Sequence, residues 1–137
     1  MILVDSCVLL DVLEDDPRWA DWSQRQLEKA SLAHPLIINP VIYTEISVRF
    51  ERIEDTHKML ATARIALKEI PRDALFLAGK AFQSYRKRGG TRTGTLPDFF
   101  IGAHAAVLGV PLLTRESGRY GGYFPSLELI TPEKGQR

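Results

Sequence analysis

The chain opens with Ile2-Leu3-Val4-Asp5, a short apolar run that ends at a carboxylate. Consecutive apolar residues are typical of a strand buried on both faces, so residues 2–4 are predicted to form a strand in the core. The run Leu36-Ile37-Ile38 predicts a second strand of the same kind. Asn39-Pro40 follows it as a helix start, with Asn as the N-cap and Pro in the first turn. A buried strand that passes directly into a helix indicates an α/β fold.

The rest of the chain continues the alternation of helices and strands. Helices are predicted over residues 7–13, 17–33, 40–50, 56–67, 73–88 and 98–108. Further strands are predicted over residues 69–70, 110–113 and 127–130, and Pro71 makes the first of these weak. We therefore expect a single α/β domain over residues 1–137, with a short, mostly parallel central sheet and helices on both faces.

Charge restricts how the chain could bind nucleic acid. With 18 basic and 17 acidic residues the net charge is +1, which excludes a strongly basic coat. Contact with nucleic acid must then come from a local patch of basic residues. The residues predicted to contact phosphates are the densest group of basic residues in the sequence, Arg86, Lys87, Arg88 and Arg92, together with Arg115 further on. The simpler alternative is a solvated helix end whose positive charge favours the helix dipole.

The N-terminal residues and the single cysteine bear on location. The first residues carry neither a basic leader nor a long apolar stretch, so no signal peptide is expected, and no apolar run is long enough to span a membrane. Cys7 is the only cysteine, which excludes an internal disulfide and suits a reducing compartment. We expect a cytoplasmic protein. No histidine is placed to activate Cys7, so a catalytic thiol is not expected.

Acidic residues are predicted to gather at one edge of the sheet. Asp5 follows the first strand and Glu116 follows the strand over residues 110–113, so both lie where open α/β sheets bind ligands. Asp98 opens a helix that is apolar nearly all round. Glu45 lies within an apolar arc of the helix after Asn39, where a carboxylate is unfavourable unless something compensates it.

Each acid also has a simpler interpretation. These are a helix cap for Asp5, a capping box with Thr95 for Asp98, an ion pair with Arg49 for Glu45, and an exposed loop position for Glu116. For these acids to share no function, all four simpler interpretations would have to be correct at once. Neighbouring carboxylates stay ionised together only around a cation, and oxygen ligands favour Mg²⁺ or Mn²⁺. Such a site can activate water and stabilise charge on a phosphate, which is the chemistry of phosphodiester hydrolysis.

Several blocks of the sequence resemble a known family. The stretch Leu96-Pro97-Asp98-Phe99-Phe100-Ile101-Gly102-Ala103-His104-Ala105 strongly resembles the third motif of PIN-domain toxins of the VapC type. The opening residues 2–6, with Leu9-Leu10-Asp11 after them, resemble the start of these toxins, and Glu45 matches their second acid. Leu112-Leu113-Thr114-Arg115-Glu116, followed by Tyr120 and Tyr123-Phe124-Pro125, resembles their C-terminal signature. The resemblance covers essentially the whole chain.

The resemblance implies a PIN-like three-layer fold and a Mg²⁺- or Mn²⁺-dependent endoribonuclease, the toxin of a type II toxin–antitoxin pair. It implies a homodimer and a cognate VapB-like antitoxin that covers or enters the active site. The expected metal ligands and catalytic residues are Asp5, Glu45, Asp98 and Glu116, with Ser6 and Thr114 in support.

One position departs from the family, because Glu116 stands where such toxins usually carry Asp. Its side chain is longer by one methylene, so Glu116 could bind the metal through water. Two alternatives remain for the function of the whole chain, and Glu116 is a hint only for the first of them. One is a PIN-like module without activity that binds an antitoxin or RNA, and the other is a structure-specific DNA nuclease.

Overall fold

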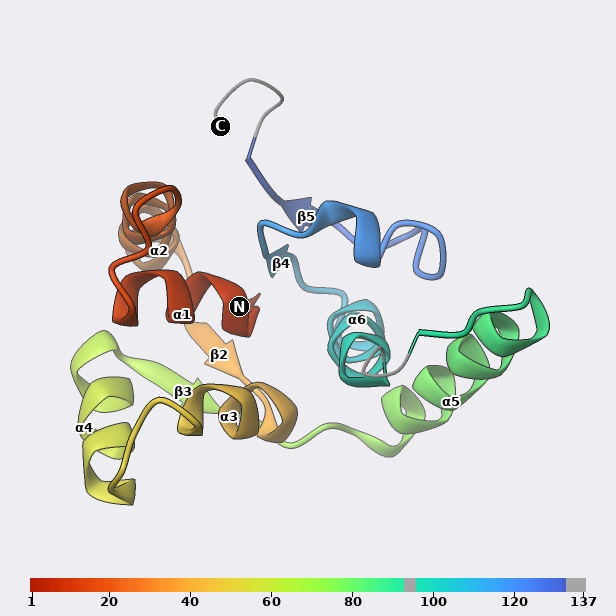
Figure 1. Cartoon of the computed structure of the whole chain (residues 1–137), viewed down its shortest axis with the longest axis horizontal. Helices are drawn as coiled ribbons and strands as arrows, with labels where there is room; N and C mark the ends of the chain where they lie inside the picture. Colours follow the sequence, from red (N-terminus) through yellow and green to blue (C-terminus); the bar gives the residue numbers. More distant parts are fainter. Residues whose placement is uncertain (93–95, 133–137) are drawn as a thin grey trace.

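The computed structural model describes residues 1–92 and 96–132 (Figure 1). Within these residues five short strands form one sheet in the order β3-β2-β1-β4-β5, and every neighbouring pair is parallel. The strands are β1 (Ile2–Val4), β2 (Leu36–Ile38), β3 (Ile65–Leu67), β4 (Leu112–Leu113) and β5 (Leu129–Ile130). The predicted short parallel sheet is confirmed.

Helices cover both faces of the sheet, as expected for a three-layer α/β fold. They are α1 (Ser6–Leu13), α2 (Ala20–Ala33), α3 (Pro40–Ser47), α4 (Ile53–Ala63), α5 (Arg72–Lys87) and α6 (Leu96–Leu108), with a short 3₁₀ helix, η1 (Ser117–Arg119). Figure 1 shows α1 and α2 on one side of the strands and α6 on the other, with α5 outside α6. Among the described residues, no helix combines the length and apolar character needed to cross a bilayer.

The prediction of a helix over residues 56–67 and a strand over residues 69–70 is wrong. Helix α4 ends at Ala63 because Arg64 adopts the left-handed conformation, with φ 57° and ψ 42°. The next residues form β3, in which Ile65 pairs with Leu36 and Leu67 pairs with Ile38. A short apolar run fits a buried strand and a helix equally well, and here pairing with β2 decided between them.

The strand order places a topological switch point at β1. The chain proceeds from β1 to β2 and β3, and then returns to β4 on the other side of β1. Because parallel crossovers are right-handed, this reversal places the connecting helices on opposite faces and opens a crevice beyond the carboxyl ends of β1 and β4. Asp5 and Thr114 are the residues that immediately follow these two strands.

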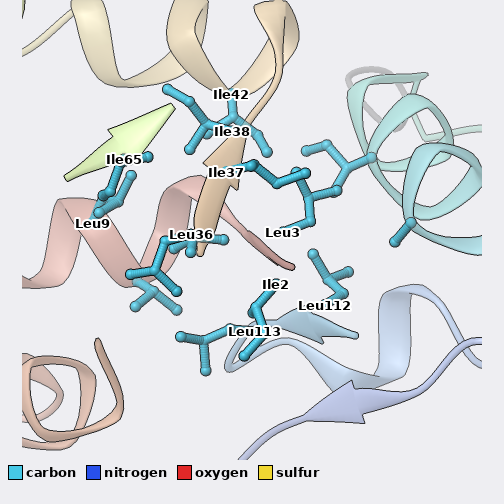
Figure 2. Close-up of a cluster of buried hydrophobic side chains, with 14 of the residues drawn as sticks. Ile2, Leu3, Leu9, Leu36, Ile37, Ile38, Ile42, Ile65, Leu112 and Leu113 are labelled. Atoms are coloured by element: carbon cyan, nitrogen blue, oxygen red, sulfur yellow. The ribbon is translucent and has the colours of Figure 1, made fainter. Parts of the chain in front are cut away.

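The core consists of the side chains of the central strands and the helices that cover them. Figure 2 shows side chains of β1, β2 and β4 packed together between the helices. Leu3 pairs with Ile37 on one side and with Leu112 on the other, and all three are buried. Helix α6 contributes Ile101 to this cluster, as its apolar sequence predicts. The first turn of α6, which carries Asp98, is thereby held against the sheet.

Candidate active site

Asp5 is a buried carboxylate at the switch point. Its side chain is not the cap of α1, although the residue occupies the N-cap position. Oδ2 accepts hydrogen bonds from Thr114 Oγ1 and Tyr120 Oη, each at 2.8 Å, and Oδ1 lies 3.5 Å from Ser6 Oγ. Asp5 is only 3% exposed, and no ion pair with it is found in the described part of the chain. Hydroxyl groups therefore stabilise its charge.

The side chains of Glu45 and Asp5 both contact the hydroxyl group of Ser6. Ser6 Oγ donates to Glu45 Oε1 at 2.9 Å, which links the start of α1 to α3. The predicted helix start holds, because Asn39 Oδ1 accepts from the backbone nitrogen of Ile42 at 2.9 Å. Arg49, the alternative partner for Glu45, forms an ion pair with Glu14 at 3.2 Å. The structure thus brings Glu45 and Asp5 together through the hydroxyl group of Ser6.

Asp98 occupies the first turn of α6 and is half-buried. Burial raises the pKa of Tyr120 far above its ordinary value, and the negative charges of Asp5 and Asp98 raise it further. Both carboxylates therefore act on the same phenol group, which stays protonated and donates to Asp5. The capping-box alternative depends on Thr95, which lies outside the described residues.

A buried polar pair joins the two helices that carry Glu45 and Asp98. Asn39 Nδ2 lies 3.1 Å from Nδ1 of His104, which is fully buried in α6. Burial lowers the pKa of His104, so its imidazole stays neutral and accepts from the amide. The histidine is therefore a residue of the core.

Glu116 lies beside the site but forms an ion pair. Its backbone nitrogen donates to Thr114 Oγ1 at 3.0 Å, and the same hydroxyl group donates to Asp5. Its Oε1 atom accepts from Arg115 Nη1 at 2.8 Å. Arg115, a predicted phosphate contact, also binds Asp11 through Nε and Nη2.

The other predicted phosphate contacts lie in the last turn of α5 and in the residues that follow it. Arg86 and Lys87 occupy the last turn of α5, Arg88 caps it, and Arg92 follows; all four are exposed. The guanidinium carbon of Arg88 is 5.5 Å from the ring centroid of Tyr123. In Figure 1 this end of α5 is at the edge of the molecule, with α6 between α5 and the strands. Arg88 thus contacts the segment that follows η1, whereas Arg92 lies in the connection between α5 and α6.

The carboxylate oxygens of the site are ligands of the kind that a hard divalent cation prefers, but the side chains are not arranged around a common point. Within the described residues, no three His, Cys, Asp or Glu side chains are close enough together to hold a metal ion. The available ligands are carboxylate oxygens, which suit Mg²⁺ or Mn²⁺. Ser6 holds Glu45 and Arg115 holds Glu116, so these two carboxylates would have to turn in order to bind a common ion.

Two residues near the site, Tyr120 and Asp11, were assigned no role from the sequence. Both occur in the blocks that resemble the toxins, which was the only signal pointing to them. Cys7 also borders the site, with its sulfur 3.6 Å from Thr114 Oγ1. Burial, followed by the charge of Asp5, raises the pKa of the Cys7 thiol to about 12, which disfavours the reactive thiolate.

Comparisons with known proteins agree with this architecture. A sequence model of the PIN domain matches residues 2–118, while no protein of curated function matches the chain. VapBC2 from Rickettsia felis, solved with a DNA fragment from its promoter, gives a TM-score of 0.71 at 17% identity over 96% of this chain and 98% of that chain. A toxin–antitoxin complex from Klebsiella pneumoniae gives 0.69 at 20% identity, covering 98% and 99%. VapBC-1 from nontypeable Haemophilus influenzae gives 0.71 at 16%, covering 96% and 98%. Identities this low show a shared fold.

Proposed function

This chain belongs to the PIN domain family, and from that premise we propose that it is a metal-dependent endoribonuclease, the toxin of a type II toxin–antitoxin pair that acts in the cytoplasm. The observation that carries the proposal is Asp5. Its carboxylate is buried at the switch point, where α/β sheets bind ligands, and its hydrogen bonds come from hydroxyl groups. A buried negative charge of this kind is compensated best by a cation.

Asp5, Asp98 and Glu45 would hold the ion, which is Mg²⁺ or Mn²⁺. When bound there, the ion would activate a water molecule and stabilise negative charge on a phosphodiester. Thr114 and Tyr120 orient Asp5 by donating to the same oxygen, Oδ2. Ser6 sets the position of Glu45 relative to Asp5. The Glu116 backbone contacts the same Thr114 hydroxyl as Asp5, but its carboxylate is paired with Arg115, and it is expected to act through a bound water.

The test is single-turnover cleavage of an RNA oligonucleotide and of the matching DNA, with Mn²⁺ or with EDTA. We expect RNA to be cut only with Mn²⁺ and DNA to stay intact. Asp5→Asn should lower the rate by more than about 100-fold, since losing a direct ligand exceeds the effect of residues that only support ligands. Asp21→Asn, an exposed acid in the first turn of α2, is the matched control and should keep the wild-type rate.

Three outcomes would contradict the proposal. Cleavage of DNA in preference to RNA would indicate a DNA nuclease. Absence of any cleavage, in a chain that still binds RNA or its antitoxin, would indicate a binding module. Full activity in Asp5→Asn would remove the assignment of the site.

An antitoxin partner is supported by the surface as well as by the fold. A cavity of about 1140 Å³ lies between α1, α2 and α4, and its lining includes Leu13, Leu27 and Met59. Leu32 at its border is 90% exposed. The solved structures described above are toxin–antitoxin complexes. We propose that an apolar segment of a VapB-like antitoxin fills this cavity and that an arginine of the same partner pairs with Asp5 or Asp98.

Titration of this chain with its co-expressed antitoxin, at low and high Mg²⁺, tests the partner. Affinity should fall as Mg²⁺ rises, because arginine and cation compete for the same carboxylates. Leu32→Lys should weaken binding by about tenfold while RNA cleavage is retained. Leu75→Lys, an equally apolar exposed position on α5, is the control. An affinity that ignores both Mg²⁺ and Leu32→Lys would place the antitoxin elsewhere.

We also propose a homodimer, for which light scattering should give twice the mass of the chain.

A further inference from the structure

Asp11 and Arg115 form a fixed ion pair beside the acidic site. Arg115 Nε lies 2.9 Å from Asp11 Oδ2 and 3.1 Å from Oδ1, and Nη2 lies 3.0 Å from Oδ1. Ser23 Oγ of α2 donates to Asp11 Oδ2 at 2.8 Å. Asp11 is 2% exposed. Because both carboxylate oxygens are engaged, the planar guanidinium is held in one orientation.

A tryptophan ring restricts the same guanidinium from another side. The guanidinium carbon of Arg115 is 5.6 Å from the ring centroid of Trp19, within the range of a cation–π contact. Trp19 in turn packs edge-on against the buried Trp22, with 6.0 Å between the ring centroids. Arg115 therefore cannot turn without losing hydrogen bonds and a ring contact together.

The remaining hydrogen bond of Arg115 reaches the site. Nη1 donates to Glu116 Oε1 at 2.8 Å. The backbone nitrogen of Glu116 donates to the Thr114 hydroxyl group, which in turn donates to Asp5. Asp11, Arg115 and Glu116 thus form a row of alternating charges with one net negative charge. Glu116 is the end of this row that borders the site.

We propose that Arg115 is a positioning residue that holds Glu116 in an ion pair and thereby lowers the affinity of the acidic site for its divalent cation, while Asp11 orients Arg115 and takes up part of its positive charge. The inference rests on the proposed function. To act at a bound cation, the carboxylate of Glu116 must leave the guanidinium, and its ion pair with Arg115 opposes that movement. The positive charge of Arg115 also reduces the negative potential at Asp5.

The experiment measures Mn²⁺ affinity of the metal-free full chain by calorimetry, so the readout does not depend on cleavage. Arg115→Gln should tighten Mn²⁺ binding by about tenfold, the scale of changes next to metal ligands. Asp11→Asn should weaken it, because the charge of Arg115 is then no longer shared with Asp11. A merely structural role would shift both variants in the same direction.

Arg18→Gln is the matched control. The guanidinium carbon of Arg18 lies 5.5 Å from the centroid of the same Trp19 ring, and Arg18 is exposed. This variant removes one positive charge from the same tryptophan without touching Asp11 or Glu116. Its Mn²⁺ affinity should stay within about twofold of wild type, since exposed charges are screened.

A double variant assigns the effect to Glu116. The gain in Arg115→Gln should disappear in Arg115→Gln/Glu116→Gln, because the released carboxylate is then missing. Equal Mn²⁺ affinity in wild type, Arg115→Gln and Asp11→Asn would overturn the inference while leaving the proposed function intact. If Arg115→Gln fails to fold, the weaker binding expected for Asp11→Asn still decides the question. A wild-type chain that binds no Mn²⁺ would overturn both proposals.

Discussion

The hydroxyl group of Tyr120 compensates a charge that would otherwise be unfavourable in the core. Asp5 is nearly inaccessible to solvent, and an ionised carboxylate in such a place requires strong hydrogen bonds. Tyr120 supplies one at 2.8 Å, and its raised pKa keeps it in the protonated, donating form. The position of the buried Asp5 carboxylate therefore depends on a residue 115 positions away in the sequence.

Tyr120→Phe tests this single contact. It removes the donor and keeps the ring, so the free energy of unfolding should fall by about 1.5–3 kcal/mol, as expected for a hydrogen bond to a charged group. Urea denaturation measures the change. Tyr123→Phe is the control, because Tyr123 contributes a ring contact with Phe99 at 5.2 Å, and no hydrogen bond of its hydroxyl is seen among the described residues. Equal losses in the two variants would show that the bond to Asp5 adds nothing to stability.

At the scale of elements, α6 approaches its neighbours closely at Gly102. A Cβ atom at this position would lie 2.5 Å from Cε2 of Phe124 and 3.0 Å from Cδ1 of Tyr120. The absence of a side chain thus allows α6, with Asp98 in its first turn, to pack against the segment that carries Tyr120. Gly79 in the middle of α5 differs, because a Cβ there would meet nothing within 4 Å.

These two glycines should respond oppositely to alanine. Gly102→Ala should lower the free energy of unfolding by about 1–3 kcal/mol, because the core must shift to admit a methyl group. Gly79→Ala should raise it by up to about 1 kcal/mol, since alanine is the better helix former. Thermal or urea unfolding of both variants measures the difference. A stabilising Gly102→Ala would mean that the aromatic rings move aside freely.

At the scale of the whole molecule, charge is segregated although the chain is nearly neutral. The acids lie at the switch point, and four exposed basic residues lie in and just after the outer end of α5. A single-stranded RNA bound at the acids would have to extend to the end of α5 to contact Arg86, Lys87 and Arg88. This arrangement predicts a long, weakly specific contact made mainly with phosphates.

The salt dependence of RNA binding tests that arrangement. For each phosphate neutralised on a single strand, affinity should fall by about 0.7 log units per log unit of salt. Arg88→Ala combined with Arg92→Ala should weaken binding and lower this slope. Arg25→Ala combined with Lys29→Ala, at exposed positions of α2, should leave the slope unchanged. If the first pair also leaves it unchanged, the end of α5 is only a solvated surface.

The sequence by itself determined the features that depend on neighbouring residues. The apolar runs at β1 and β2 and the Asn39 cap follow local patterns, and each is found in the structure. The position of Asp5 at the edge of the sheet was predicted for the same reason, because Asp5 directly follows β1. Local patterns failed at β3, where the apolar run over residues 65–67 could continue a helix or begin a strand. Only its hydrogen bonds with β2 decided between the two.

The tertiary structure alone decided which partner each acid has. Asp5 is bound by Tyr120, and Asp11 by Arg115, across more than a hundred residues of sequence. The sequence placed Glu116 beside Asp5, but the structure pairs its carboxylate with Arg115. The physical reason is that a side-chain ion pair depends on distances between elements. Those distances are set by sheet order and helix packing, which no local pattern of residues encodes.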